Sequence, residues 1–261
     1  MAKRWRWVRS GAGGPSENMA LDEAMLSVAR PRPTLRTYRW DPWTLSLGYF
    51  QAVSRVQVED FRARGFGVVR RPTGGGAIFH ADELTYAFVC PTGTPGVPDD
   101  TLGAYDLVHG AIRRALRRVG TESAVRGDKP LVSDTGDPDE FWCFYKSSEF
   151  DLVAGNRKLV GSAQRRTGRG FLMHGSIPVA PNDETPRAAD AGTSAMALAE
   201  LLAEELAKGL CRLMSIRCPK VWTGTFGSGR LNTGPTTRDG CSGIPGATLP
   251  RGIWATGPRI P

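Results

Sequence analysis

The sequence predicts an α+β domain with a mixed, mainly antiparallel sheet flanked by helices. Short apolar runs typical of strands and longer runs with helical spacing follow one another without the strict alternation of a parallel α/β sheet. The 261 residues suffice for one large domain or two small ones. Apolar residues at 40% and charged residues at 23% are ordinary for a globular chain, so a packed core is expected.

The predicted elements are apolar runs separated by turn-forming residues. The runs with strand composition are residues 4–8, 34–39, 43–49, 67–70, 84–89, 149–153, 157–163 and 171–179. The runs with helical spacing are residues 16–27, 58–64, 105–119 and 194–214. Ser16, directly after Pro15, is the expected N-cap of the first helix.

The periodic pattern ends near residue 220. Residues 1–220 carry the predicted strands and helices, whereas residues 221–261 are rich in Gly, Thr, Pro and Arg and show no apolar period. Such a composition buries too little apolar surface to fold by itself. We therefore predict one folded domain over residues 1–220 and an irregular or disordered C-terminal tail over residues 221–261.

The composition also argues against several classes of protein. No apolar run approaches the ~18 residues that span a bilayer, and the start MAKRWRWVRS lacks the apolar core of a secretory signal. The five cysteines are scattered without a Cys-x-x-Cys pair, which argues against a disulfide framework and a zinc site. We expect a cytoplasmic enzyme that binds no metal ion and no membrane.

The net charge of +8 has two explanations that the sequence leaves open. A basic surface attracts acidic partners. Alternatively, the bias reflects codon composition, because only six of the 34 basic residues are lysines. No basic stripe interleaved with aromatic residues and no nucleic-acid-binding module is recognisable, so we expect no nucleic-acid partner.

Three consecutive glycines at 74–76, within the segment RRPTGGGAIFH at residues 70–80, are the most informative feature. Glycine loses much backbone entropy on folding and packs no side chain, so the run has another purpose than stability. It is either a tight turn between strands or a surface of bare N–H groups against which a ligand lies. The spacing fits neither a P-loop nor a dinucleotide fingerprint. The donors that would flank a ligand are Arg70, Arg71 and His80.

A second candidate site combines Cys143 with Lys158. The cysteine is either a buried structural residue or a nucleophile, and a nucleophile requires a cation or a helix N-terminus nearby. Lys158 is a rare lysine on a strand whose small residues, 161–163, leave room for a ligand. Its alternative role is that of a solvated side chain at a sheet edge.

The hairpin predicted around Gly155-Asn156 sets a condition on that pair. It places Lys158 opposite Val153 and not opposite Cys143. The two side chains meet only if residues 141–148 fold back over the sheet. His174, in an apolar run, is either a core histidine satisfied by the backbone or a donor to an acyl carbonyl or thioester.

Four blocks resemble the superfamily of lipoate–protein ligases, octanoyltransferases and biotin ligases. SENMALDE resembles its first helix, RRPTGGGAIFH its Arg-Arg-x-x-Gly-Gly-Gly-x-x-x-His signature, RKLVGSAQR its Lys-x-x-Gly-x-Ala strand, and HGSIP closes the set. The resemblance covers roughly residues 3–215. Within the superfamily, Cys143 fifteen residues before Lys158 is similar to the Gram-positive type octanoyltransferase.

The resemblance implies an acyltransferase catalytic domain that acts in protein lipoylation. Octanoyl would pass from octanoyl-acyl-carrier protein to the lysine of a lipoyl-domain acceptor, a glycine-cleavage H protein or a 2-oxoacid dehydrogenase E2, without a cofactor. Cys143 would attack the thioester and hold octanoyl as an acyl-enzyme. Lys158 would stabilise the thiolate and the developing oxyanion. The expected substrate-binding residues are Arg70, Arg71, Thr73, Gly74, Gly75, Gly76, His80, Gly161, Ser162, Ala163, His174 and Gly175.

Two other functions remain compatible with these residues. An ATP-dependent lipoate–protein ligase would hold an acyl-adenylate, with ATP and Mg²⁺, against the glycine segment and Lys158. A non-catalytic acyl- or carrier-binding protein would retain only the scaffold. Ligases of this superfamily lack the cysteine, so Cys143 rather than the glycine segment distinguishes the transferase from the ligase.

Overall fold

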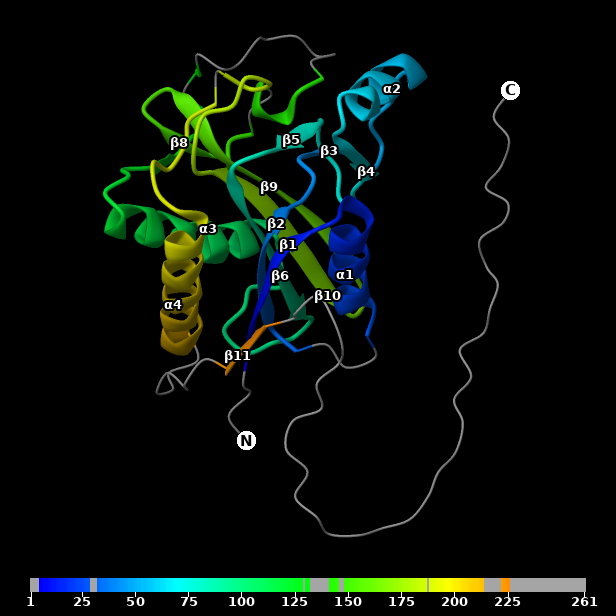
Figure 1. Cartoon of the computed structure of the whole chain (residues 1–261). Coiled ribbons are helices and arrows are strands. Elements are labelled where there is room, and N and C mark those ends of the chain that lie inside the picture. Colours follow the sequence, from blue (N-terminus) through cyan, green and yellow to red (C-terminus); the bar gives the residue numbers. More distant parts are fainter. Residues whose placement is uncertain are drawn as a thin grey trace, which may run out of the picture. The chain divides into compact units, whose positions relative to one another are not determined.

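An eight-stranded mixed sheet forms the centre of the protein (Figure 1). The computed structural model describes residues 5–28, 32–128, 130–131, 141–145, 148–186, 188–213 and 222–225. The strands of the large sheet lie in the order β11-β1-β2-β6-β10-β9-β8-β7. Their bounds are β1 Arg6–Gly13, β2 Thr34–Trp40, β6 Glu83–Pro91, β7 Ala124–Val125, β8 Leu152–Ala154, β9 Arg157–Thr167, β10 Gly170–Pro178 and β11 Trp222–Thr225.

Pairing in the large sheet is mainly antiparallel, as the sequence predicts. β1 pairs in parallel with β2 and β11, whereas the neighbouring strands from β2 to β7 in the sheet order are antiparallel. The β8–β9 hairpin turns at Gly155, whose φ of 59° favours glycine. It places Val153 opposite Lys158, which confirms the predicted register. The predicted α+β class is confirmed.

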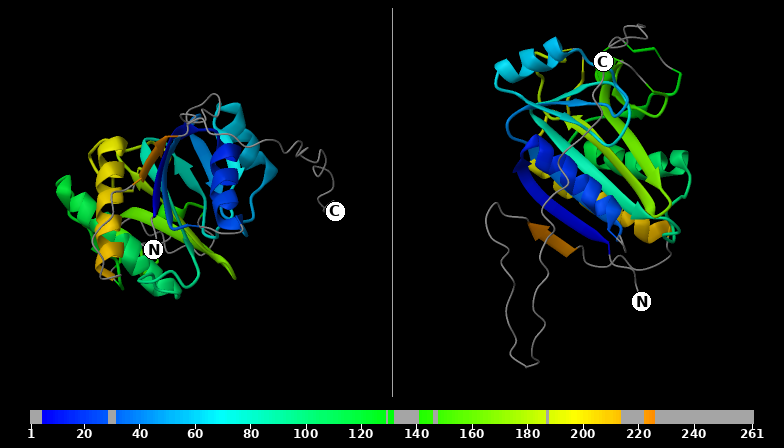
Figure 2. Two further views of the ribbon diagram at one scale, coloured as in Figure 1. Left: turned by 90° about the horizontal axis from the view of Figure 1, so that it is seen from below. Right: turned by 90° about the vertical axis from the view of Figure 1, so that its right-hand side faces the viewer.

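Helices cover both faces of this sheet (Figure 2). α3 (Thr101–Arg118) and α4 (Ala195–Leu213) lie on one face, and α1 (Pro15–Ser27) lies on the other. Along β6, Tyr86 and Phe88 join the core beneath α3 and α4, whereas Ala87 and Val89 join the core beneath α1. Successive side chains of a strand point to opposite faces, so one central strand serves two cores. Within the described ranges, no helix combines the length and apolar character that crossing a membrane requires.

A three-stranded sheet in the order β4-β3-β5 holds the glycine segment. Its aromatic core joins Phe61, Phe66 and Phe79, whose ring centroids lie 5.0 to 6.1 Å apart. The glycine segment connects β4 to β5, so this small sheet fixes both of its ends. The bounds of these elements are β3 Thr44–Leu47, α2 Arg55–Ala63, β4 Gly67–Arg70 and β5 Ile78–His80.

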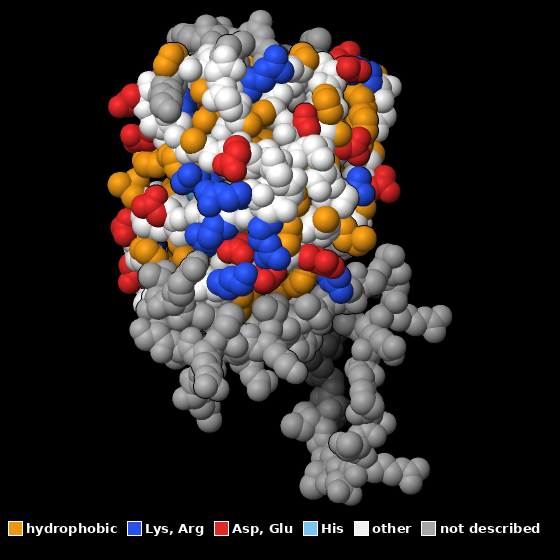
Figure 3. Space-filling view, turned by 90° about the vertical axis from the view of Figure 1, so that its left-hand side faces the viewer, with side chains coloured by type: hydrophobic (Ala, Val, Ile, Leu, Met, Phe, Trp, Pro, Cys, Tyr) orange, Lys and Arg blue, Asp and Glu red, His pale blue; other side chains and the backbone are white. Residues whose placement is uncertain are grey.

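Charged side chains link α3 to α4 on the surface (Figure 3). The Arg114 guanidinium lies 3.0 Å from the Glu205 carboxylate, and Arg118 lies 2.6 Å from Glu204 and 3.3 Å from Glu205. Lys208 pairs with the same two carboxylates at 2.8 and 2.9 Å. Part of the basic excess on this face is therefore neutralised within the protein.

The structure corrects some predicted details. Gly14, not Ser16, is the N-cap of α1, Pro15 occupies the first helical turn, and no side chain caps the helix. α3 begins four residues earlier than predicted because the Asp100 carboxylate accepts a hydrogen bond from Gly103 N at 2.8 Å. The short strands β5, β7 and β11 escaped prediction because two to four residues carry no period.

The proposed boundary at residue 220 stays a prediction. β11 lies within the segment expected to be irregular, where it pairs with β1. Residues 226–261 lie outside the described part of the chain. All described residues belong to a single unit, Met1–Gly227.

We expect Gly170→Ala to destabilise the fold. A Cβ at residue 170 would lie 2.3 Å from the carbonyl oxygen of Cys90 on the paired strand, so the two strands would have to separate. The free energy of unfolding should fall by about 1–3 kcal/mol, measured by denaturant titration. The control is Gly168→Ala, where a Cβ meets nothing within 4 Å. Equal stabilities for the two variants would contradict the expectation.

Candidate active site

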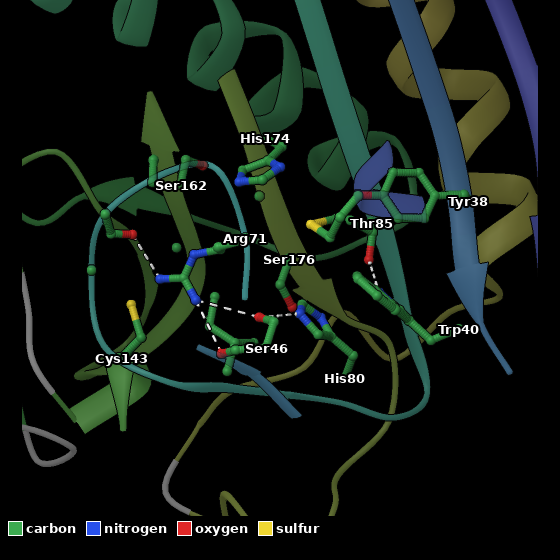
Figure 4. A pocket seen from close by; sticks show the side chains of 17 residues that line it. Tyr38, Trp40, Ser46, Arg71, His80, Thr85, Cys143, Ser162, His174 and Ser176 are labelled. Atoms are coloured by element: carbon green, nitrogen blue, oxygen red, sulfur yellow. Dashed lines mark hydrogen bonds between the residues drawn. The ribbon is translucent and has the colours of Figure 1, made fainter. Parts of the chain in front are cut away.

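A pocket opens between the glycine segment and the large sheet (Figure 4). The space between its walls is about 440 Å³, part of it open to solvent, and most of the lining is apolar. Among the residues predicted from sequence, those that line it are Arg71, Gly74, Gly75, His80, Cys143, Gly161, Ser162, Ala163, His174 and Gly175. Thr73, Gly76 and Lys158 lie behind this lining and contact residues that form it. Arg70 does not line the pocket and instead donates to Gly48 O and Gln51 O of the turn after β3.

The glycine segment lets a distant segment of the chain come close. A Cβ at Gly76 would lie 3.0 Å from both Cys143 N and Phe141 O. Gly75 has a φ of 97°, and a Cβ there would lie 2.8 Å from the Arg71 guanidinium and 3.8 Å from Cys143 Sγ. Side chains at these positions would displace the cysteine, so the glycines are needed for backbone approach as well as for the turn.

Arg71 fixes the shape of the glycine segment. Its Nη2 donates to the carbonyl oxygens of Gly74 and Gly76, both at 2.7 Å, and its Nη1 donates to Ser46 O at 3.1 Å. The side chain is buried, and this burial lowers the pKa of the guanidinium despite the opposing effect of Cys143. Within the described residues, its buried Nε–H has no hydrogen-bond partner. Arg71 therefore serves to hold the glycine segment in shape.

Cys143 reaches the pocket because residues 141–145 fold back against β5. Ala77 N donates to Phe141 O at 2.8 Å, and Cys143 N donates to Ala77 O at 2.7 Å. A short 3₁₀ turn, Cys143–Tyr145, then leads away. The condition set by the hairpin is thus met, and Lys158 Nζ lies 3.8 Å from Cys143 Sγ and 3.0 Å from Cys143 O.

Lys158 is a buried ammonium with a carboxylate partner. Its side chain is 3% exposed, and Nζ lies 2.8 Å from Asp151 Oδ2. Burial disfavours the charged form, but the charges of Cys143 and Asp151 outweigh it and raise the pKa of Lys158 above its ordinary value. The ammonium therefore stays charged beside the sulfur. Asp151 was missed by sequence reasoning, and the signal was its place just before the strand that pairs with Lys158.

Ser162 anchors a hydrogen-bonded chain behind the pocket. Its hydroxyl lies 2.5 Å from Tyr86 Oη and 2.8 Å from His109 Nε2, and His109 Nδ1 lies 2.8 Å from Phe150 O. Burial lowers the pKa of His109 to about 4, so the ring is neutral at pH 7, donates from Nδ1 and accepts from Ser162. His109 and Tyr86 were missed because each lies in an apolar run typical of core residues.

His174 belongs to a buried polar chain beneath the glycine segment. Its Nδ1 lies 3.2 Å from Asp22 Oδ2, and its Nε2 lies 2.5 Å from the Thr73 hydroxyl. Burial lowers the pKa of His174 even though Asp22 opposes the shift. Asp22 is itself held by Arg36 at 2.8 Å and by Tyr38 Oη at 2.8 Å. Side chains, rather than the backbone, thus satisfy the histidine.

His80 occupies the opposite side of the pocket from Cys143 (Figure 4). Its Nδ1 lies 2.8 Å from Glu83 Oε1 and its Nε2 lies 2.7 Å from Ser46 Oγ. The ring stacks on Trp40 with centroids 4.3 Å apart. Both ring nitrogens are engaged, so His80 shapes the wall. Among the described residues, no group of His, Cys, Asp and Glu side chains is arranged to hold a metal ion.

Comparison with known proteins assigns the family of this chain. The lipoyl protein ligase A/B catalytic domain family matches residues 14–211. The chain belongs to this family. A solved lipoate–protein ligase A bound with ATP superposes over 87% of this chain and 90% of its own, with a TM-score of 0.61 at 21% identity. A bipartite lipoate protein ligase from Thermoplasma acidophilum covers 86% and 88%, with a TM-score of 0.58 at 19% identity.

Proteins that share more sequence identity with this chain are named octanoyltransferases. The chain is 41% identical over 179 residues to octanoyltransferase LipM of Kyrpidia tusciae, which covers 66% of this chain. The matched segment spans 65% of the length of that relative. The predicted resemblance to octanoyltransferases of this superfamily is confirmed.

The depressed pKa of His109 predicts a loss of stability in acid. The unfolded chain takes up a proton on this histidine near its ordinary pKa of 6.5, whereas the folded chain does so only near 4. Stability is therefore complete above about pH 6.5 and falls as the pH drops toward 4, by at most about 3 kcal/mol from this group. His109→Gln should show a shallower pH dependence in denaturant unfolding between pH 7 and 4. If the wild type and His109→Gln lost stability equally between pH 7 and 4, the lowered pKa of His109 would be contradicted.

Proposed function

We propose that this protein transfers octanoyl from octanoyl-acyl-carrier protein to the lysine of a lipoyl-domain acceptor through a thioester on Cys143. The observation that carries the proposal is the sulfur of Cys143 at the pocket wall, 3.8 Å from the charged Lys158. The identity to proteins named octanoyltransferase supports the same activity. Glycine-cleavage H protein and 2-oxoacid dehydrogenase E2 are the acceptors we expect.

The first step loads the enzyme. The Cys143 thiolate attacks the thioester carbonyl carbon, a new carbon–sulfur bond forms, and the bond to the carrier thiol breaks. The carrier leaves as a thiolate and takes up a proton from solvent. The Lys158 ammonium lies beside the sulfur and the backbone carbonyl oxygen of Cys143. There it stabilises the attacking thiolate and the negative charge that develops on the thioester oxygen of the substrate.

The second step delivers octanoyl to the acceptor. The neutral amine of the acceptor lysine attacks the Cys143 thioester, an amide forms, and the Cys143 thiolate is released. The proton lost by the amine leaves to solvent, and the Cys143 sulfur beside the Lys158 ammonium is free for another cycle. No nucleotide is consumed, because the energy of the amide bond comes from the thioester.

The walls of the pocket suit a narrow acyl chain. A Cβ at Gly161 would lie 3.0 Å from Lys158 Cε and 4.0 Å from Cys143 Sγ, so a larger residue would close the slot at the reacting atoms. Burying the tail contributes roughly 0.8 kcal/mol per methylene, or about 5–6 kcal/mol in all. A reducing compartment keeps cysteine thiols free, so we expect the reaction in the cytoplasm.

Cys143→Ala should abolish transfer without ATP. The wild-type protein, incubated with octanoyl-acyl-carrier protein alone, should gain the mass of one octanoyl group on Cys143, and addition of an apo lipoyl domain should remove it. Cys143→Ala should lower the transfer rate at least about a thousandfold. Cys90→Ser, at the buried cysteine on β6, is the matched control and should load normally. Transfer that requires ATP and proceeds in Cys143→Ala would establish the ligase alternative.

Removing the Lys158 charge should slow both half-reactions. Lys158→Gln removes the cation next to the sulfur, and we expect rates of loading and transfer to fall by about 10²–10³-fold. Lys208→Gln, at an exposed lysine paired with α4 carboxylates, is the control and should react like the wild type. Loading by Lys158→Gln at the wild-type rate, in folded protein, would refute the role of the ammonium.

A further inference from the structure

The turn that follows β3 exposes two aromatic rings. Phe50 is 88% exposed and Tyr49 is 48% exposed, and their rings pack edge to face with centroids 4.8 Å apart. Single exposed apolar side chains are common on protein surfaces. Two adjacent exposed aromatic rings on one turn are typical of a protein-binding surface, because Tyr and Phe are enriched at protein interfaces.

This turn is held rigidly against the glycine segment. Arg70 Nη1 donates to the carbonyl oxygens of Gly48 at 2.5 Å and Gln51 at 2.9 Å, and Tyr49 N donates to Thr73 O at 2.8 Å. A Cβ at Gly48 would lie 1.7 Å from Gly75 O, so the two backbones touch. The aromatic rings are therefore presented by a preorganised turn, which lowers the entropic cost of binding a partner.

The same turn contacts segments on either side of the pocket, and we infer that it forms part of the pocket rim. On one side, Gln51 Nε2 donates to Phe141 O at 3.0 Å, two residues before Cys143. On the other side, the Arg165 guanidinium lies 5.8 Å from the centroid of the Tyr49 ring. Arg165 follows the pocket-lining residues of β9, so the contact joins the glycine wall to the β9 wall across the rim.

Charged side chains extend from the pocket rim along α1 and the β9–β10 hairpin. Arg165 Nη1 lies 3.2 Å from Glu23 Oε1, and these two residues line a groove together with Arg169. Among the described residues, the hydrogen bonds of Arg70 and Arg169 go to neutral carbonyl oxygens, the latter to Ser27 O at 3.1 Å. The Arg165 charge is compensated by Glu23, whereas the guanidinium charges of Arg70 and Arg169 have no carboxylate partner among the described residues and complement a partner carrying carboxylates.

We propose that Tyr49, Phe50, Arg165 and Arg169 form the docking surface for the lysine-bearing acceptor domain, a protein with acidic side chains beside its acceptor lysine. This rests on the proposed function. A lysine has only a four-carbon stem, so the acceptor backbone must come to the rim before its amine reaches Cys143. The acyl-carrier protein presents its thioester on a longer prosthetic arm and can load Cys143 from farther away.

The test compares Phe50→Ala and Arg169→Gln with the wild type in three measurements. Loading of Cys143 from octanoyl-acyl-carrier protein is followed by intact mass. Discharge of the acyl-enzyme is measured with hydroxylamine, a small amine that needs no docking, and with an apo lipoyl domain. Affinity for the apo lipoyl domain is measured directly at two salt concentrations, which does not depend on catalysis.

We expect loading and hydroxylamine discharge to stay within twofold of the wild type. Discharge by the lipoyl domain at subsaturating concentration, and its affinity, should fall about tenfold or more in Phe50→Ala. Arg169→Gln should weaken the salt dependence of binding. The matched control is Met196→Ala, because Met196 is an apolar residue on α4 that is 72% exposed. This variant should change none of these values.

The alternatives give different results. Unchanged discharge and affinity in Phe50→Ala would overturn the docking surface while leaving the transferase intact. A loss of loading from the carrier with normal discharge would assign the surface to the carrier protein and overturn the proposal. If the wild type binds the lipoyl domain, Phe50→Ala loses that binding, and the wild type transfers no octanoyl, the docking surface is supported and the proposed function is overturned.

Discussion

The site depends on one close approach between two backbone segments. Ala77 N donates a hydrogen bond to Phe141 O, and Cys143 N donates one to Ala77 O. The two segments can come this close only because Gly75 and Gly76 have no side chains. It carries the sulfur of Cys143 across the fold to Lys158, fifteen residues away along the chain. The glycine run thus allows the Cys143 segment to pack against it, a role that the sequence did not reveal.

Burying the Lys158 ammonium is costly unless its charge is compensated, because transfer of an ion into the protein interior removes its hydration. Asp151 supplies that compensation at 2.8 Å, and the sulfur of Cys143 adds to it. The hairpin register that sets Val153 opposite Lys158 also brings Asp151 within reach. In the proposed reaction, the same dry surroundings would strengthen the electrostatic interaction of Lys158 with a developing oxyanion.

The three histidines of the chain lie around this pocket, and each has both ring nitrogens engaged with protein groups. His109 and His174 have lowered pKa values because they are buried, and so they act as neutral members of hydrogen-bonded chains. These chains hold Ser162 and Thr73 in place. The histidines therefore position the walls beside Cys143 and Lys158, the pair that we propose as reactive.

The sequence by itself determined the long elements and the family blocks, because apolar periods, turn residues and glycine runs are local properties of the chain. It also determined the β8–β9 register, since a tight turn at Gly155 fixes which residues face each other. It could not place Cys143, Asp151, His109 or the rim formed by Tyr49 and Arg165. These positions depend on contacts between segments that are distant in the chain, which only packing of the sheets selects. The tertiary structure therefore decided that the cysteine and the lysine meet.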